Sequence, residues 1–429
     1  VEEAVALMEQ GLADLPAAKG GCSRMFLLLN YGWEMLLQRD ASPTAGAEVE
    51  RDHTLMGVLE EALGLARSSC KGYPQEESNL LLNLALAAFH EGKLSLAQGY
   101  LRQARTTSGK MTVLQTLWAH DIEGRLAMAT DEFSTALEHY QALESLAEKM
   151  LHPEGVWRAL VGQAQAKDAL GDAPGAHALF AGAEAHLASE SLLVPVHAGR
   201  DFFLARRAHA TGAYVDSLLR AGLEHEAFAV VRTNRSRLLG GLMMRQRIQG
   251  LEGSERLAWD VAMGQFYRER EAAESAARGL WELSAKELPQ ARARLAERHR
   301  AAREALDVAL VRAGMDAVPE VAQGGLRAPG SGELFLGYYK APGGWMGFAQ
   351  DAAGLRVRRL GERDLKQSSP EELALYFLRP FAEEIRRNST LLFFPWGETR
   401  GLDFHALPFS GAPLMASKAV AYSLDLPRY

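Results

Sequence analysis

Apolar positions recur with a helical period through the first part of the chain. The clearest unit is SNLLLNLALAAFHEGKLSLAQGYLRQA, residues 78–104, in which two amphipathic segments flank a turn at Gly92. Small residues at Ala85, Ala97 and Ala104 allow two helices to approach closely, and leucines fill the space between them. The segment therefore predicts a helical hairpin.

The same small–large–small spacing recurs in three further units. Their turns are predicted at Asp131, Gly171 and Gly222, so that successive turns lie 39, 40 and 51 positions apart. The spacing resembles the tetratricopeptide family, whose strict repeat has about 34 residues, so these would be repeats with insertions. Because one unit cannot bury its apolar face alone, the resemblance implies an α-solenoid with a concave groove.

In the tetratricopeptide family the first helix of each pair lines this groove. The residues that the resemblance places there are Trp118, Asp121, Arg125, Arg158, Gln165 and Asp168. They could bind a protein partner or a protein substrate. They could equally form a solvated face with one half-buried tryptophan, and the pattern does not choose between the two.

Two long helices are predicted between residues 254 and 313, with a break near Leu288–Pro289. In the second helix, Leu288, Leu295, Ala302 and Ala309 recur every seven residues, as in a coiled-coil seam of modest apolarity. The charges on both helices are mixed, so we interpret this helical hairpin as a spacer and not as a binding element.

A basic segment precedes the hairpin. Residues 232–247, RTNRSRLLGGLMMRQR, carry no acidic residue and five arginines: Arg232, Arg235, Arg237, Arg245 and Arg247. Such a run can mark phosphate contacts, but here it belongs to a helix with an apolar opposite face. We therefore interpret it as a solvated helix face, with pairing to acidic residues of the next helices as a second role. We do not expect direct nucleic-acid binding.

The period falls from 3.6 to 2 after the Gly- and Pro-rich segment 319–332, which is predicted to be a linker. The elements expected beyond it are strands at about 333–339, 345–350 and 355–360, a helix at 369–387, a buried strand at 390–394 and a short strand at 419–424. This order predicts an α/β domain. The last two strands are expected to pair in parallel, and an unpaired edge is expected to expose Phe393 and Phe394.

Two stretches of this region resemble a known family. LFLGYYKAPGGWMGFAQDAAGLRVRRLG, and then LLFFPWGETRGLDFHALPF followed by PLMASKAVAYSL, resemble the first part of a CHAT domain. CHAT domains are caspase-like cysteine peptidase domains that commonly follow tetratricopeptide arrays. Trp396 stands where an acidic residue is usual in that family.

The resemblance implies the repeat scaffold and pro-catalytic portion of a bacterial-type CHAT protease of defence or signalling. A protein or ribonucleoprotein partner held by the repeats would activate cleavage of a protein substrate. In that family the catalytic His and Cys lie on later strands, and no cysteine follows Cys70 here. We therefore expect no His–Cys dyad and no peptidase activity in this chain. The alternative is a non-catalytic adaptor with a degenerate CHAT fold.

Asp403, His405 and Ser410 follow the buried strand closely. The three residue types are those of a serine hydrolase, but closeness in sequence is not the geometry of a catalytic triad. We expect His405 to be a partly buried structural imidazole. The resemblance makes the surrounding residues Leu402, Leu407, Pro408 and Phe409 packing residues.

Composition adds four expectations. The chain has 429 residues, 48% apolar content and a net charge of −7, which is ordinary for a soluble protein of more than one domain. No apolar run approaches the roughly 20 residues of a membrane span, so we expect a cytoplasmic protein without membrane contact. Cys22 and Cys70 are expected to be reduced, buried thiols. No phosphate loop, metal constellation or dinucleotide motif is present, so no cofactor is expected.

Together these features predict a mainly α protein with a partial α/β domain. The expected divisions are a tetratricopeptide-like solenoid at 1–250, a helical hairpin at 251–318, a linker at 319–332 and the first part of a CHAT-like domain at 333–429.

Overall fold

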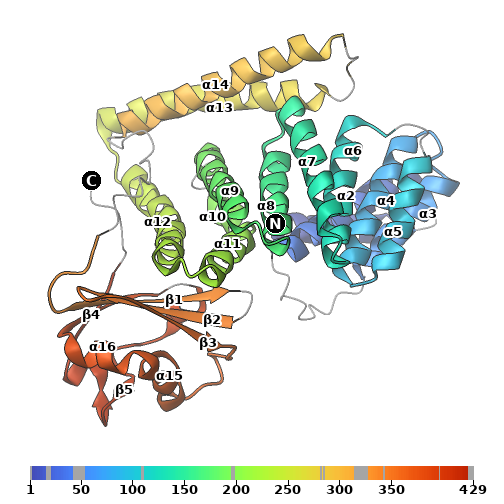
Figure 1. The fold of residues 1–429 in the computed structure, drawn as a ribbon. Coiled ribbons are helices and arrows are strands. Elements are labelled where there is room, and N and C mark those ends of the chain that lie inside the picture. The colour runs from blue at the N-terminus through green and yellow to red at the C-terminus, as the bar shows by residue number, and fades with distance from the viewer. Residues whose placement is uncertain are drawn as a thin grey trace. The chain divides into compact units, whose positions relative to one another are not determined.

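The structure is a computed structural model, shown in Figure 1. It describes residues 2–15, 21–41, 54–107, 111–194, 199–280, 283, 286–313, 327–341, 344–395 and 397–423. The chain divides into two compact units. One unit comprises residues 1–183 and 265–304, and the other comprises residues 184–264 and 305–429. The predicted boundaries at 250 and 318 did not anticipate that residues 184–264 group with the sheet.

The first unit is built mainly from helices joined in pairs. They are α1 (Glu2–Asp14), α2 (Gly21–Ala41), α3 (Leu55–Ser68), α4 (Pro74–His90), α5 (Leu94–Thr107), α6 (Val113–Ala129), α7 (Phe133–Met150), α8 (Pro153–Ala169) and the first part of α9 (Ala173–Leu193). The predicted turn residues Gly92, Asp131 and Gly171 all have positive φ, at 72°, 60° and 85°. A residue in the left-handed backbone conformation lets the chain reverse direction between two helices. The predicted hairpins are therefore confirmed.

Small residues allow the helices of this unit to approach closely, as the spacing predicted. The Tyr140 ring of α7 lies against Gly124 of α6 and Gly162 of α8. A Cβ at these glycines would lie 2.7 Å and 2.4 Å from its ring atoms. Ala136 and Ala164 are fully buried in the same region. One large side chain therefore fills the space that the glycines of two helices leave open.

The two cysteines correct one expectation. Cys22, at the start of α2, and Cys70, just after α3, form a disulfide with their Cα atoms 5.5 Å apart. The prediction of two reduced thiols is therefore wrong. The residues are 48 positions apart, and the antiparallel pairing of α2 with α3 brings their ends together.

The predicted helical hairpin is confirmed. Helices α13 (Gly253–Arg278) and α14 (Leu288–Arg312) run side by side (Figure 1), and α14 begins at the predicted break. Leu295 is fully buried and clusters with Ala273 and Leu280. Arg298 Nη1 lies 2.9 Å from Glu269 Oε2 and pairs the two helices across their exposed side.

The second unit contains a five-stranded mixed sheet. Its strands are β1 (Glu333–Ala341), β2 (Gly344–Asp351), β3 (Gly354–Gly361), β4 (Thr390–Phe394) and β7 (Ala419–Tyr422), in the order β3-β2-β1-β4-β7. The pairs β1–β2 and β2–β3 are antiparallel, whereas β1–β4 and β4–β7 are parallel. The predicted strands and the parallel pairing of the last two are confirmed, and they form part of an open sheet.

Helices cover both faces of this sheet (Figure 1). On one face lie α15 (Pro370–Phe377) and α16 (Ala382–Arg387), over a core that includes Leu334, Leu336 and Tyr338. On the other face lie α11 (Ala208–Arg220) and α12 (Glu224–Gln249), over Phe335 and Tyr339. Successive β1 residues alternate between the two cores, as the pleat of a strand requires. A short helix, α10 (Arg200–Ala205), precedes α11.

The covered faces overturn the expected exposure of Phe393 and Phe394. Phe393 is fully buried and stacks on Phe404 at 4.4 Å between ring centroids. Phe394 is 4% exposed and meets Phe335 edge-on at 5.2 Å. The expectation considered only the helix that follows β3, whereas α11 and α12 cover the second face.

The predicted helix at 369–387 is interrupted. A capping box joins Ser369 and Glu372 at the start of α15, but a 3-10 turn, Arg379–Phe381, separates α15 from α16. Pro380 has no N–H to continue the helical ladder, which explains the break.

Several predicted features lie outside the described residues. They are residues 319–326 of the linker, the turn residues 342 and 343, Trp396 and residue 424. None of the described helices has the combination of length and apolar character that a bilayer crossing requires.

A candidate binding pocket in the helical repeats

A concave pocket of about 230 Å³ opens in the first unit. Its lining residues come from α2, α4, α6 and α8, each the first helix of a pair. Apolar side chains such as Leu82 and Ile122 form most of the wall, and Asn30, Asn79 and Asn83 contribute amide groups. The wall thus combines apolar surface with groups that donate and accept hydrogen bonds.

Trp118 is the centre of an aromatic cluster in this wall. Its ring centroid lies 6.3 Å from that of Trp33 on α2. His152, at the start of α8, meets Trp118 edge-on at 5.6 Å. The guanidinium of Arg158 lies over the Trp118 ring, with its Cζ 5.5 Å from the centroid. The cation and the two rings hold the indole in place and leave it half-buried.

A buried carboxylate anchors the arginines. Asp121 Oδ2 lies 3.1 Å from Arg125 Nε and 3.5 Å from Arg158 Nη1. Arg158 Nε also donates to Glu154 Oε1 at 2.8 Å. A buried charge is tolerated when it is paired and hydrogen-bonded in this way. Burial, and then the Asp121 carboxylate, raise the pKa of Tyr140, so its hydroxyl stays neutral.

His152 is held in its neutral form. Its Nδ1 accepts a hydrogen bond from Gly155 N at 3.0 Å and so caps α8. Burial lowers the pKa of His152, although the nearby Glu154 carboxylate opposes this shift. A protonated Nδ1 could not accept the capping bond, so burial and capping favour the same state.

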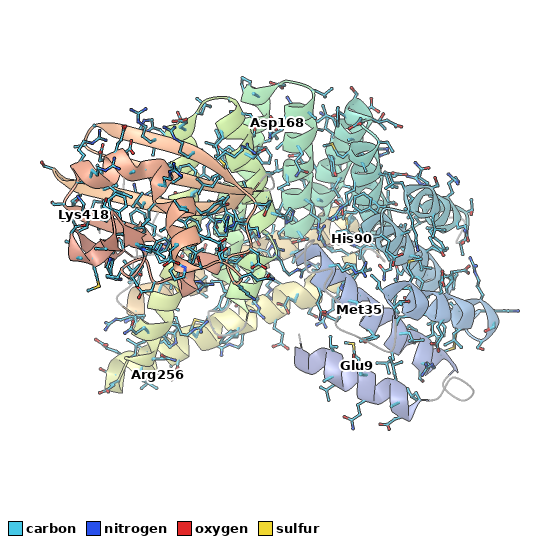
Figure 2. The ribbon with its side chains drawn as sticks, turned by 90° about the horizontal axis from the view of Figure 1, so that it is seen from below. Glu9, Met35, His90, Asp168, Arg256 and Lys418 are labelled. Atoms are coloured by element: carbon cyan, nitrogen blue, oxygen red, sulfur yellow. A yellow bond between two sulfur atoms is a disulfide. The ribbon has the colours of Figure 1, made fainter. Side chains whose placement is uncertain are left out.

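The structure brings together part of the predicted groove set. Trp118, Asp121 and Arg158 line the pocket, and Arg125 joins them through Asp121. Gln165 and Asp168 lie further along α8, outside the lining residues; Figure 2 labels Asp168. The prediction missed the residues that α2 and α4 contribute: Asn30, Trp33, Asn79 and Asn83. In the tetratricopeptide family the first helix of each pair lines the groove. Applying this rule to the pairs α2–α3 and α4–α5 would have identified these residues.

The basic segment corrects another interpretation. Arg232 and Arg235 of α12 are each only 5% exposed, so they do not form a solvated face. Arg232 Nη2 donates to Arg327 O at 2.8 Å, and Arg235 Nη2 donates to Ser423 O. Their guanidinium groups lie 5.8 Å and 5.3 Å from the centroid of the Phe394 ring. Because α12 packs on the sheet, its arginines cover aromatic rings.

The second predicted role, pairing with acidic residues of the next helices, is found at Arg247, whereas Arg237 pairs with an acidic residue of the earlier helix α9. Arg237 Nη1 lies 2.9 Å from Glu184 Oε2, and Arg247 Nη2 lies 3.8 Å from Glu255 Oε2. Arg245 is partly buried. The side chains of residues 238–243, which the sequence assigned to the apolar face, lie outside the described residues.

Asp403, His405 and Ser410 do not form a triad. His405 Nε2 lies 3.0 Å from Val420 O and Nδ1 lies 3.2 Å from the Tyr422 hydroxyl. Nε2 donates to the Val420 carbonyl and is therefore engaged with the main chain and not with Ser410, while Nδ1 also lies 3.4 Å from Asp403 Oδ1. Ser410, with φ 55°, occupies the exposed turn between β5 (Pro408–Phe409) and β6 (Ala412–Pro413). The expected structural role of His405 is confirmed.

The loop around His405 also packs as expected. Leu407 is 4% exposed, and Leu402 and Phe409 pack against the same core.

Comparison with known proteins gives no assignment. No protein-family model matches the chain, and no curated protein matches it.

Proposed function

We propose that the helical repeats form a tetratricopeptide-like solenoid whose groove binds an extended segment of a partner protein. The pocket around Trp118 carries this proposal. Its volume of about 230 Å³ lies below the roughly 300–1,000 Å³ of small-molecule sites. It suits one large apolar side chain, with the amides of Asn79 and Asn83 near the main chain of the bound segment.

The pocket residues are of the types that dominate binding energy. Trp and Arg anchors in desolvated pockets typically cost about 2 kcal/mol or more when truncated. Trp118 and Arg158 lie in contact, and Arg158 is prepositioned by Asp121 and Glu154. A segment that inserts an apolar side chain beside Trp118 would therefore meet an already ordered surface.

A peptide array tests this function. The array identifies extended peptides that the purified chain binds. Trp118→Ala or Arg158→Glu should weaken the binding of these peptides by about 10-fold or more, because truncating such anchor residues typically costs about 2 kcal/mol. Arg125→Glu should weaken binding less, because Arg125 acts through Asp121. Arg102→Glu, an exposed charge reversal on α5, is the matched control. Calorimetric titration gives the affinities and circular dichroism checks the helix content. Equal affinity in the pocket variants and the control would place the binding site elsewhere.

For the chain as a whole, we propose the repeat scaffold and pro-catalytic portion of a CHAT caspase-like cysteine protease. A protein or ribonucleoprotein partner would activate it to cleave a protein substrate. The motifs in residues 333–429 and the mixed sheet with parallel strands β1, β4 and β7 support this proposal.

The alternative proposal is a non-catalytic adaptor with a degenerate CHAT fold. The chain's two cysteines are joined in a disulfide, and a cysteine peptidase needs a free thiolate. Incubating the chain with unfolded protein substrates, with and without iodoacetamide, tests this point. We expect no cleavage in either sample. Iodoacetamide-sensitive cleavage would contradict both proposals, because neither places a catalytic His–Cys dyad in this chain.

A further inference from the structure

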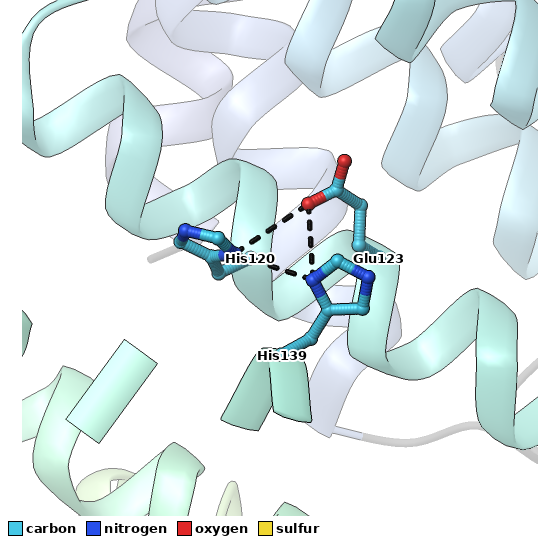
Figure 3. A group of neighbouring side chains, drawn as sticks. All are labelled: His120, Glu123 and His139. Atoms are coloured by element: carbon cyan, nitrogen blue, oxygen red, sulfur yellow. Dashed lines mark hydrogen bonds and ion pairs between the residues drawn. The ribbon is translucent and has the colours of Figure 1, made fainter. Parts of the chain in front are cut away.

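Two histidines and a glutamate converge on the side of α6 that faces away from the pocket. His120 and Glu123 lie one turn apart on α6, and His139 approaches them from α7 (Figure 3). A helix turns by about 100° per residue, which places His120 and Glu123 almost opposite Trp118 and Asp121. The cluster is therefore separate from the proposed peptide site.

Three potential metal ligands of this cluster face one another. His120 Nδ1 lies 3.3 Å from His139 Nδ1 and 3.5 Å from Glu123 Oε2, and His139 Nδ1 lies 3.3 Å from the same oxygen. Glu123 Oε2 is buried, yet it accepts no hydrogen bond within the part of the chain that the structure describes. The Nδ1 atoms of His120 and His139 thus lie close to Glu123 Oε2, but neither forms a hydrogen bond with it.

A single ion would account for these distances. Zinc binds His nitrogen at about 2.0–2.1 Å and carboxylate oxygen at about 2.0–2.2 Å. Bonds of this length at the tetrahedral angle set two ligands about 3.4 Å apart, whereas the right angle of an octahedral site sets them about 3.0 Å apart. The observed 3.3–3.5 Å fit the tetrahedral case.

The surroundings prepare these ligands. Arg105 Nη2 pairs with Glu123 Oε1, which leaves Oε2 turned towards the rings. The three side chains remain 23%, 16% and 28% exposed, so an ion and a water molecule can reach them.

We propose that His120, Glu123 and His139 bind one divalent transition-metal ion of the Zn²⁺ type, with water as the fourth ligand. Imidazole and carboxylate ligands in a tetrahedral arrangement favour Zn²⁺ over ions that prefer square-planar or octahedral sites. The ion would join the two helices of one hairpin. The sequence did not reveal this site, because His139 lies 19 residues beyond His120, on the next helix.

Metal titration of the full chain, stripped with a chelator, tests the site. We expect one Zn²⁺ per chain by calorimetry, and one Co²⁺ with the intense visible absorption of tetrahedral coordination. His139→Ala should weaken both by at least the roughly 10–100-fold that loss of a mere outer-shell partner costs. Glu123→Gln, which keeps the shape but loses the charge, should weaken binding in the same direction.

The matched control is His225→Ala, an exposed histidine on α12 in the other unit, which should leave metal binding unchanged. Three outcomes would overturn the proposal: no Zn²⁺ binding by the parent chain, equal affinity in the parent and His139→Ala, or the pale Co²⁺ spectrum of six-coordinate geometry. Circular dichroism of each variant distinguishes lost ligands from lost folding. Because peptide binding is measured at the opposite side of α6, failure here leaves the proposed peptide function intact.

Discussion

Two regions of the molecule are packed in different ways. Around Tyr140 of the helical repeats, alanines, leucines and glycines surround a single large ring. In the sheet unit, rings pack on rings: Phe404 contacts Phe393, Tyr338 and Phe377 with centroids 4.4, 5.7 and 5.9 Å apart. Helices that approach closely need small residues, whereas a helix layer lies farther from a sheet and leaves room for rings.

Individual arginines of the two units have different hydrogen-bond partners. Arg158 of the repeats pairs with carboxylates at the rim of a pocket. Arg232 and Arg235 of the sheet unit donate to carbonyl oxygens and lie over aromatic rings. A guanidinium on a long apolar stem can serve either role.

The largest effect on stability is expected from the substitution Phe404→Ala. Truncating a buried phenylalanine typically costs about 3–5 kcal/mol, and Phe404 is fully buried at the centre of the ring cluster. We expect that loss in the free energy of unfolding of the sheet unit, with the repeats unchanged. Hydrogen exchange followed by mass spectrometry reports both units in one sample.

Phe404→Leu, which keeps apolar volume, is the control and should cost less. An equal loss of protection in both units would show that they unfold as one body, and the contrast between their interiors would then have no separate energetic meaning.

A smaller effect is expected from Gly162→Ala in the repeats. The added Cβ would lie 2.4 Å from Tyr140 ring atoms, and overpacking of this kind typically costs about 1–3 kcal/mol. Gly99→Ala on α5 is the matched control, because no atom lies within 4 Å of its added Cβ. It should stabilise the repeats by about 0.5–1 kcal/mol through helix propensity. Urea unfolding followed by circular dichroism measures both, and stabilisation by both substitutions would contradict close packing at Tyr140.

Local signals explain what the sequence predicted well. The turns at Gly92, Asp131 and Gly171 depend on residues that tolerate positive φ, and the heptad seam of α14 depends on spacing within one helix. Each is encoded within a few neighbouring residues. The strands of the sheet were found for the same reason, by alternation along each segment.

Features that depend on distant segments were missed. The burial of Phe394, the roles of Arg232 and Arg235, and the Cys22–Cys70 disulfide all depend on contacts between elements far apart in the chain. The candidate pocket was half predicted, because Trp118 and Arg158 follow the repeat rule. The pocket residues of α2 and α4 follow the same rule, but the prediction did not apply it to these two helices.

The smallest effect is expected from a change in pH, which should destabilise the two units at different pH values. Burial lowers the pKa of His152 in the repeats from 6.5. In the sheet unit, burial opposes the charge of Asp351, but hydrogen bonds from Asn388 and Arg387 outweigh it and lower the pKa from 3.8. A group whose pKa is lower in the folded state stabilises the protein above its unfolded pKa and loses that contribution as pH falls.

The two losses should therefore occur in different windows. His152 should destabilise the repeats as pH falls below 6.5, whereas Asp351 should begin to affect the sheet unit only below 3.8. Between about pH 7 and pH 5, linkage limits the His152 effect to at most about 2 kcal/mol. His152→Asn keeps a capping oxygen for Gly155 N but does not titrate, so it should reduce the slope of the repeats by the part that His152 contributes. Urea midpoints of the parent and the variant at both pH values, read in each unit by hydrogen exchange, measure the difference. If the parent and His152→Asn lose the same stability over this range, the pH sensitivity of the repeats has another source, because only the imidazole differs between the two proteins.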